Sequence, residues 1–181
     1  MRRRFFRFLY FRLMGWKSLI TVDIPPKCVV CVAPHTSNWD LIVGKAFALS
    51  HGIKFQFLIK KFWMRFPMSL LIGPLGGIPV DRKVKEGTVR AMAKRFEASS
   101  RLILAVTPEG TRRANRNWKS GFYHIAHGAG VPILLAGMDY RTKTVVMTQS
   151  VTPLGDYESD IAQIKSYFKT FKALKPERFI Y

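Results

Sequence analysis

The sequence predicts a single-domain α/β fold in which helices flank a mostly parallel or mixed sheet. Short apolar runs alternate with helical patterns along most of the chain, as they do in βαβ units. The 181 residues are close to the size of one domain, and 48% hydrophobic with 23% charged residues is an ordinary globular composition. These values exclude a disordered or fibrous chain.

Six short apolar runs, bounded by polar or glycine-containing turns, predict the strands. They lie at 28–33, 54–59, 77–80, 102–106, 131–137 and 144–150. Apolar residues three or four positions apart predict the helices. These lie at 39–50, 61–71, 86–98, 119–127 and 157–174. The apolar face of the last helix comprises Ile161, Ile164, Phe168, Phe171 and Leu174, and such a face is typical of a helix that covers a sheet.

Cys28 and Cys31 form a CxxC pattern, which in a loop could be a redox pair or half of a zinc site. Here the pattern lies within a buried strand, where residues three apart point to opposite faces of the sheet. We therefore expect two separate structural thiols. The other histidines, His51, His124 and His127, lack a carboxylate partner at ligand spacing, so no metal site is predicted.

Basic and aromatic residues dominate the first eighteen positions, with six of each. Arg7 and Arg12 interrupt the apolar residues, which is unlike a cleavable secretory signal. Aromatic rings suit the lipid headgroup boundary and arginines suit anionic phosphates. We therefore expect residues 1–22 to be a basic amphipathic membrane-contact segment, with a helix lying in the membrane interface, ahead of a domain at 23–181. The alternatives are a first helix packed on the core and a segment that holds nucleic acid.

The charge of the chain indicates an anionic partner. Its 30 Lys and Arg residues against 11 Asp and Glu residues give a formal net charge of +19. A membrane-spanning helix needs roughly 20 consecutive apolar residues, and proline and glycine break the longest uncharged runs of this chain. We therefore expect no membrane-spanning helix.

Polar residues follow the predicted strand at 28–33. His35 stands five positions before Asp40, which falls in the first turn of the next predicted helix. A carboxylate on one imidazole nitrogen fixes the tautomer and leaves the other nitrogen able to take a proton from a hydroxyl. The same spacing fits a simple helix cap, so the residues alone leave both interpretations open. N–H groups at this helix start are candidate donors to an oxyanion.

Three further strand ends carry cations. The strand at 102–106 leads into Glu109, Gly110, Thr111 and Arg112, where glycine allows close approach to the backbone and arginine can bind a phosphate through two hydrogen bonds. The alternative is a solvated turn with a local Glu109–Arg112 pair. Lys60 and Lys61 follow the strand at 54–59, and Asp81, Arg82 and Lys83 follow the strand at 77–80. In a parallel sheet these ends meet at one edge.

Taken together, these residues resemble four motifs of the lysophospholipid acyltransferase family, in the family's order. The motifs are His35 to Asp40, Gly77-Ile78-Pro79-Val80-Asp81-Arg82, Pro108-Glu109-Gly110-Thr111-Arg112 and Val131-Pro132-Ile133. The resemblance covers residues 28–137 and implies that His35 is the general base and Asp40 its orienter. It also implies a substrate-binding group in which Arg82, Arg112 and Lys61 hold the acceptor phosphate. In the same group, Glu109 binds the acceptor or positions Arg112, beside Gly110 and Thr111.

The resemblance implies a reaction that moves a fatty acyl chain from an acyl thioester, on coenzyme A or acyl carrier protein, to the hydroxyl of a lysophospholipid. The favoured acceptor is 1-acyl-glycerol-3-phosphate, and the alternatives are another lysolipid, glycerol-3-phosphate or an amino-acid lipid. No further cofactor is expected. The resemblance implies peripheral association, and the expected location is the cytoplasmic side of the cell membrane. A noncatalytic membrane- or nucleic-acid-binding protein is the rival class, although the carboxylate in the third motif disfavours nucleic acid.

Overall fold

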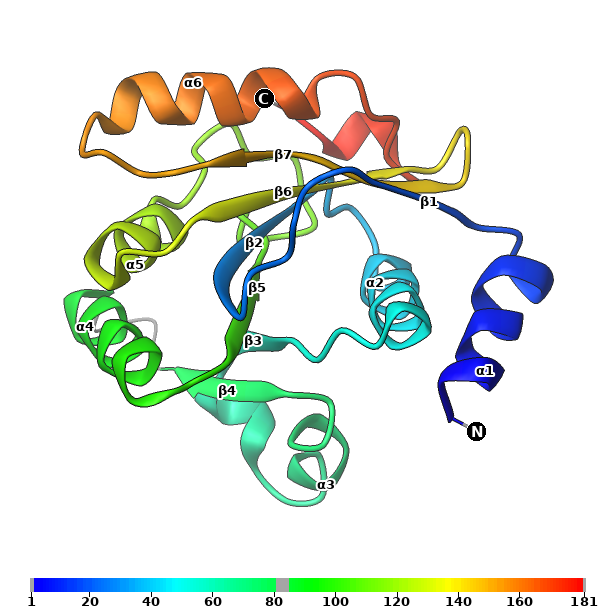
Figure 1. The fold of residues 1–181 in the computed structure, drawn as a ribbon, viewed down its shortest axis with the longest axis horizontal. Coiled ribbons are helices and arrows are strands. Elements are labelled where there is room, and N and C mark those ends of the chain that lie inside the picture. The colour runs from blue at the N-terminus through cyan, green and yellow to red at the C-terminus, as the bar shows by residue number, and fades with distance from the viewer. Residues whose placement is uncertain (1, 81–84, 181) are drawn as a thin grey trace.

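Strands from the whole length of the chain form one mixed sheet in the computed structural model, which describes residues 2–80 and 85–180 (Figure 1). The strands are β1 (Lys17–Ile20), β2 (Lys27–Ala33), β3 (Gln56–Lys60), β4 (Gly77–Val80), β5 (Leu102–Val106), β6 (Ile133–Asp139) and β7 (Thr144–Val151). Their order is β1-β7-β6-β2-β5-β3-β4, and among these described strands only the β6–β7 pair is antiparallel. The predicted α/β class with a mixed sheet is confirmed.

Helices cover both faces of the sheet. They are α1 (Arg2–Arg7), η1 (Phe8–Leu13), α2 (Trp39–His51), η2 (Lys61–Met64), α3 (Ser69–Ile72), α4 (Lys85–Ala98), α5 (Gly121–Ala129), α6 (Tyr157–Phe168) and η3 (Pro176–Arg178). One apolar layer joins the sheet to α4, α5 and α6, and a second joins it to η1 and α2. Figure 1 shows α4 and α5 on the opposite side of the sheet from α1 and α2.

The central strand β2 contributes side chains to both layers. Val29 and Cys31 pack under α4, α5 and α6, whereas Cys28 and Val30 pack under α2. The two cysteines are free thiols on opposite faces, as the two-residue period of a strand predicts. Burial raises the pKa of Cys28 to about 12, so this thiol stays neutral. The expectation of two separate structural cysteines is confirmed.

Three elements differ from the predicted ones. The predicted helix at 61–71 is split into η2 and α3, because Pro67 lacks an N–H donor and disfavours helical geometry at the residue before it. Helix α6 ends at Phe168, so Leu174 lies beyond it and is exposed. Strand β1 was not predicted, since its four residues join the sheet only by pairing with β7, more than 120 positions later.

The N-terminal segment has one side on the core and one side in solvent. Tyr10 and Trp16 are buried, and the Tyr10 hydroxyl donates to the Lys17 carbonyl at 2.7 Å. Phe5 and Phe8 on the same segment are exposed. The packed helix that the sequence left as an alternative is therefore present, together with an exposed aromatic side. No helix within 2–80 or 85–180 has the length and apolar character needed to cross a bilayer.

Candidate active site

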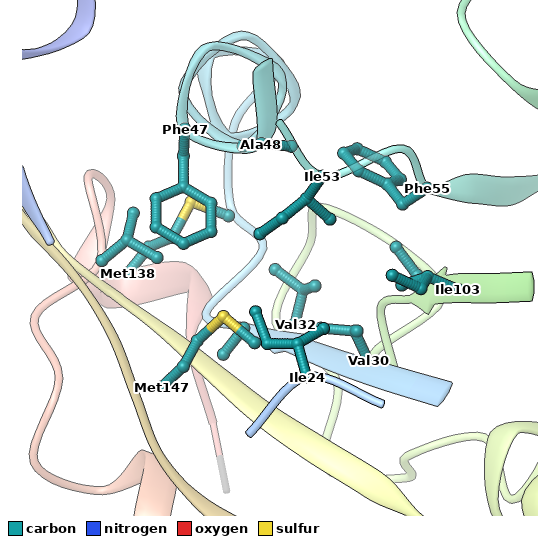
Figure 2. A pocket seen from close by; sticks show the side chains of 14 residues that line it. Ile24, Val30, Val32, Phe47, Ala48, Ile53, Phe55, Ile103, Met138 and Met147 are labelled. Carbon is teal, nitrogen blue, oxygen red and sulfur yellow. The ribbon is translucent and has the colours of Figure 1, made fainter. Parts of the chain in front are cut away.

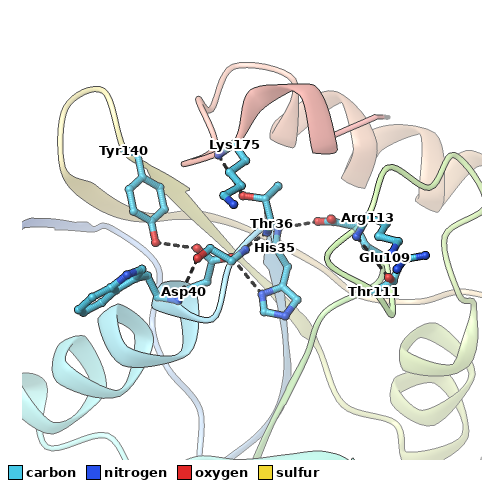
Figure 3. A network of polar contacts seen from close by, with 10 residues as sticks. His35, Thr36, Asp40, Glu109, Thr111, Arg113, Tyr140 and Lys175 are labelled. Atoms are coloured by element: carbon cyan, nitrogen blue, oxygen red, sulfur yellow. Dashed lines mark hydrogen bonds and ion pairs between the residues drawn. The ribbon is translucent and has the colours of Figure 1, made fainter.

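Three loops meet at the carboxyl edge of the sheet. Strands β5 and β6 both run parallel to β2, so the residues that follow these three strands emerge at the same edge. His35 follows β2, Glu109 follows β5 and Tyr140 follows β6. Figure 3 shows the three side chains gathered around Asp40 and the loop that leads into α2. The strand order thus brings together residues that lie about a hundred positions apart.

The predicted His35–Asp40 pair is formed. Nδ1 of His35 lies 3.1 Å from Oδ2 of Asp40, and the histidine side chain keeps 15% of its surface exposed while the aspartate side chain keeps 1%. The same carboxylate oxygen accepts the main-chain N–H groups of Thr36 at 2.8 Å and Ser37 at 2.9 Å. One carboxylate oxygen therefore holds both the histidine ring and the main chain of the loop before α2, whereas the N-cap residue Asn38 forms no side-chain cap hydrogen bond.

Those two main-chain bonds involve N–H groups near the expected oxyanion donors. The N–H groups of Thr36 and Ser37 stand at the start of α2, where donors to an oxyanion were expected. Both already donate to Asp40 in this structure. The N–H of Trp39 also has an acceptor, the Ser37 hydroxyl at 3.2 Å. The Thr36 and Ser37 donors therefore position the Asp40 carboxylate.

Tyr140 completes the surroundings of Asp40, and sequence reasoning missed it. Its hydroxyl donates to Oδ1 of Asp40 at 2.6 Å, and its ring meets the Trp16 ring edge-on at 5.0 Å between centroids. Its main-chain N–H donates to the carbonyl of Lys172 at 2.9 Å, which fastens this turn to the C-terminal segment. Because Tyr140 lies three positions after the predicted strand at 131–137, inspection of all strand ends was the signal that could have found it.

The hydrogen bonds around Asp40 favour its ionised form. Burial by itself raises the pKa of the carboxyl, but the bonds from His35, Tyr140 and the Ser37 N–H outweigh that effect and lower the pKa below its usual value. An ionised Asp40 accepts the proton on Nδ1 of His35, which leaves Nε2 as the basic nitrogen. No described residue hydrogen-bonds Nε2. The ring can therefore take a proton from a substrate that reaches its exposed side.

Glu109 connects the loop after β5 to the loop after β2. It is 2% exposed, and its Oε1 accepts the main-chain N–H of His35 at 2.8 Å. Its Oε2 is buried and has no hydrogen-bond partner among the described residues. Burial raises the pKa of Glu109 to about 8, with a smaller contribution from the charge of Asp40. At neutral pH the side chain is therefore mainly protonated.

The rest of the third motif lies at the surface. Gly110 has a φ of +65°, a left-handed conformation that glycine adopts without strain, so the turn itself requires this residue. The Thr111 hydroxyl accepts the main-chain N–H of Arg113 at 3.2 Å, and Arg112 is exposed. Within residues 85–180 Arg112 forms no ion pair with Glu109, so the local pair considered from the sequence is absent. The guanidinium remains open to an anion from solvent.

The remaining predicted cations stand at the β3 and β4 ends. Lys61 is exposed at the start of η2, directly after β3, and β3 runs parallel to β5. Lys61 therefore emerges at the same edge as Glu109, although no contact joins the two. Arg82 lies outside the described residues. Among residues 2–80 and 85–180, no three His, Cys, Asp or Glu side chains form a group that could hold a metal ion.

An apolar pocket lies between α2 and the sheet (Figure 2). Its cavity volume is about 70 Å³, and every residue that lines it is apolar or glycine. Val30 and Val32 of β2 form part of its wall, opposite Phe47 of α2. The strand that ends just before His35 thus also borders a space suited to a hydrocarbon.

Comparison with known proteins identifies the family. A family model described as Acyltransferase matches residues 21–138. The chain belongs to this family. The matched region contains His35, Asp40 and Glu109, the residues that the fold brings together.

Two curated relatives and one solved structure extend the comparison. The chain is 35% identical over 142 residues to a probable 1-acyl-sn-glycerol-3-phosphate acyltransferase of Mycoplasma pneumoniae, covering 70% of this chain and 50% of that protein. A protein of the same name from Mycoplasma genitalium is 32% identical over 130 residues, covering 65% and 47%. The chain therefore spans about half the length of these relatives. The 1-acyl-sn-glycerophosphate acyltransferase PlsC of Thermotoga maritima shares the fold, with a TM-score of 0.61, 17% identity, and coverage of 92% of this chain and 76% of that one.

Proposed function

We propose that this protein transfers a fatty acyl chain from an acyl thioester to the free hydroxyl of a lysophospholipid, with 1-acyl-glycerol-3-phosphate as the acceptor and phosphatidic acid as the product. The observation that carries the proposal is the His35–Asp40 pair at the carboxyl edge of an acyltransferase-family domain. The name shared by both Mycoplasma relatives supports the choice of acceptor. Coenzyme A or acyl carrier protein carries the acyl chain, and no other cofactor takes part.

The proposed reaction is a direct transfer. The acceptor oxygen attacks the thioester carbonyl carbon while Nε2 of His35 takes the hydroxyl proton, and Asp40 stabilises the resulting imidazolium. The new C–O ester bond forms, the C–S bond breaks, and the leaving thiolate recovers the proton from His35. Neither buried cysteine is needed for this sequence of steps. Tyr140 and Glu109 act as positioning residues, the first on Asp40 and the second on the main chain of His35.

The acceptor phosphate is proposed to bind to Arg112, Lys61 and Arg82. The exposed position of Arg112 beside the site supports this role, since a guanidinium binds phosphate through two parallel hydrogen bonds. Gly110 and Thr111 form the turn that presents Arg112. The Glu109 side chain is buried and accepts the main-chain N–H of His35. We therefore assign it an indirect part in acceptor binding, in which it holds the His35 loop in place.

The apolar pocket under α2 supports an acyl substrate. Its wall offers no polar side chain, so a hydrocarbon group placed there leaves no polar group unpaired. We propose peripheral attachment to the anionic cytoplasmic surface of the cell membrane through residues 1–22, with residues 23–181 as the catalytic domain. The exposed Phe5 and Phe8 beside exposed arginines support this attachment.

Thiol release from an acyl thioester tests the proposal. Purified protein is mixed with 1-acyl-glycerol-3-phosphate in detergent, and wild type is compared with His35→Ala and with His124→Ala as a matched surface control on α5. We expect acceptor-dependent release that falls by roughly 10²–10⁴ only in His35→Ala. Retained activity in that variant contradicts the role of His35. Silence of folded wild type with a panel of lysolipids contradicts the acyltransferase proposal.

A further inference from the structure

The chain between β3 and β4 leaves the sheet as an exposed apolar projection. This segment, residues 61–75, contains η2 and α3 and is called the β3–β4 excursion below. Six of the fifteen large apolar side chains found exposed in the described residues lie within it. They are Phe62, Trp63, Phe66, Met68, Leu70 and Leu75. A soluble surface rarely gathers so many large apolar side chains in one short segment, so the excursion is a candidate contact surface.

The excursion is fixed at its base and open at its tip. Ile72 is buried, and its Cγ2 approaches Gly77 so closely that a Cβ added there would lie 2.4 Å away. Phe66 is 82% exposed and Leu70 66% exposed. Strand β4 is the edge strand of the sheet, and Figure 1 shows α3 beyond it, away from the helices that cover the two faces. The exposed side chains therefore project from an anchored base.

The charged residues within the excursion are all cationic. No Asp or Glu occurs between positions 41 and 80, whereas Lys60, Lys61 and Arg65 lie in or beside the excursion. The Arg65 guanidinium lies 5.6 Å from the centre of the Phe62 ring, so cation and aromatic ring share one site. Two copies of such a surface repel each other. Aromatic rings interleaved with arginine and lysine instead complement an anionic lipid headgroup layer.

We propose that the β3–β4 excursion docks on the surface of an anionic bilayer, with its aromatic and aliphatic tip in the headgroup region and its cations on lipid phosphates. This contact is additional to the proposed N-terminal attachment and concerns a different segment. Helix η2 begins at the carboxyl end of β3, the edge that also carries His35 and Glu109. Docking through the excursion turns this edge of the sheet toward the lipid surface.

Vesicle binding by the full chain tests the proposal. Wild type is titrated with phosphatidylcholine vesicles and with vesicles that also contain phosphatidylglycerol. Leu70→Ser is compared with Leu154→Ser, the same change at a leucine that is 86% exposed outside the excursion. We expect the control to bind as wild type does, and the double variant Phe66→Ser/Leu70→Ser to bind anionic vesicles about tenfold more weakly or worse. Arg65→Glu is expected to weaken binding to the anionic vesicles selectively.

Four outcomes overturn the proposal. The first is wild-type affinity for anionic vesicles in both the double variant and Arg65→Glu, and the second is an equal loss of affinity in Leu70→Ser and Leu154→Ser. The third is a dimer of this chain that the double variant abolishes. The fourth is binding of an acidic acyl carrier protein through the excursion, without binding to lipid vesicles. Circular dichroism establishes that each variant is folded before its affinity is compared. Acyl-transfer turnover in detergent separates this proposal from the proposed function. The double variant is expected to turn over at the wild-type rate in detergent and more slowly than wild type on anionic vesicles.

Discussion

Removal of one hydroxyl tests whether the structure assigns Tyr140 its correct role. Tyr140→Phe deletes the O–H that donates to Oδ1 of Asp40 at 2.6 Å. The ring remains in its edge-on contact with Trp16. Oδ2 keeps its three contacts, with Nδ1 of His35 and the N–H groups of Thr36 and Ser37. The substitution therefore removes a single bond from an otherwise intact carboxylate.

The cost follows from the burial and charge of Asp40. A hydrogen bond to a buried charged group contributes about 1.5–3 kcal/mol, so the free energy of unfolding at neutral pH is expected to fall by about that amount. The Tyr140 bond also helps to lower the pKa of Asp40, so its loss raises that pKa. A lowered aspartate pKa stabilises the fold above the pKa of the unfolded chain, and this stabilisation is lost as pH falls through the folded pKa. In Tyr140→Phe the loss is expected to begin at a higher pH.

The same bond holds the orienter of the general base. With half of its free energy expressed in the transition state, kcat falls about 4- to 13-fold, whereas KM for both substrates stays near the wild-type value. Urea denaturation between pH 4 and 7 and thiol-release kinetics measure the two effects. Tyr167→Phe is the matched control, because its hydroxyl donates to the Val146 carbonyl at 3.1 Å, away from the site. Equal kcat in wild type and Tyr140→Phe, with unchanged stability, refutes the positioning role.

Two further perturbations address the loop after β5. Arg112→Lys is expected to raise KM for a phosphorylated acceptor and to leave KM for an acceptor without phosphate unchanged, because lysine cannot form the two parallel hydrogen bonds. An equal rise in KM for both acceptors argues against phosphate binding by Arg112. The pKa of Glu109 is about 8 in the folded protein, against an ordinary value of 4.5. Between these two pH values the folded state holds one more proton than the unfolded state. The free energy of unfolding therefore falls as pH rises, by up to about 1.4 kcal/mol per pH unit. Urea denaturation between pH 5 and 8 is expected to show this slope in wild type and a weaker one in Glu109→Gln, and identical slopes contradict a protonated Glu109.

Local patterns were sufficient to predict most of the regular elements. The apolar runs at 77–80 and 102–106 are β4 and β5 as the structure bounds them, and the alternation of runs predicted a mixed or parallel sheet. The two-residue period of a strand places Cys28 and Cys31 on opposite faces of the sheet. Both the strand alternation and the helix period are properties of neighbouring residues, so the sequence contains them directly.

Elements that depend on distant pairing were less accessible. Strand β1 has four residues and is stabilised by β7, which no local pattern around residue 17 records. The segment at 61–71 has the apolar content of a helix, but Pro67 divides it into η2 and α3. Most of its large apolar side chains are exposed and do not pack in the core. Burial is set by what packs against a segment, and periodicity alone cannot supply that.

The sequence by itself determined the α/β class, the spacing of His35 and Asp40, and the cationic strand ends. Only the tertiary structure decided that Tyr140 completes the hydrogen bonds of Asp40 from 100 positions away, and that Glu109 binds the His35 main chain from 74 positions away. It also decided which aromatic residues of the N-terminal segment are buried and which face solvent. The reason is physical: spacing within a loop is local geometry, whereas these contacts depend on the order of parallel strands, which sets the loops that meet at the sheet edge.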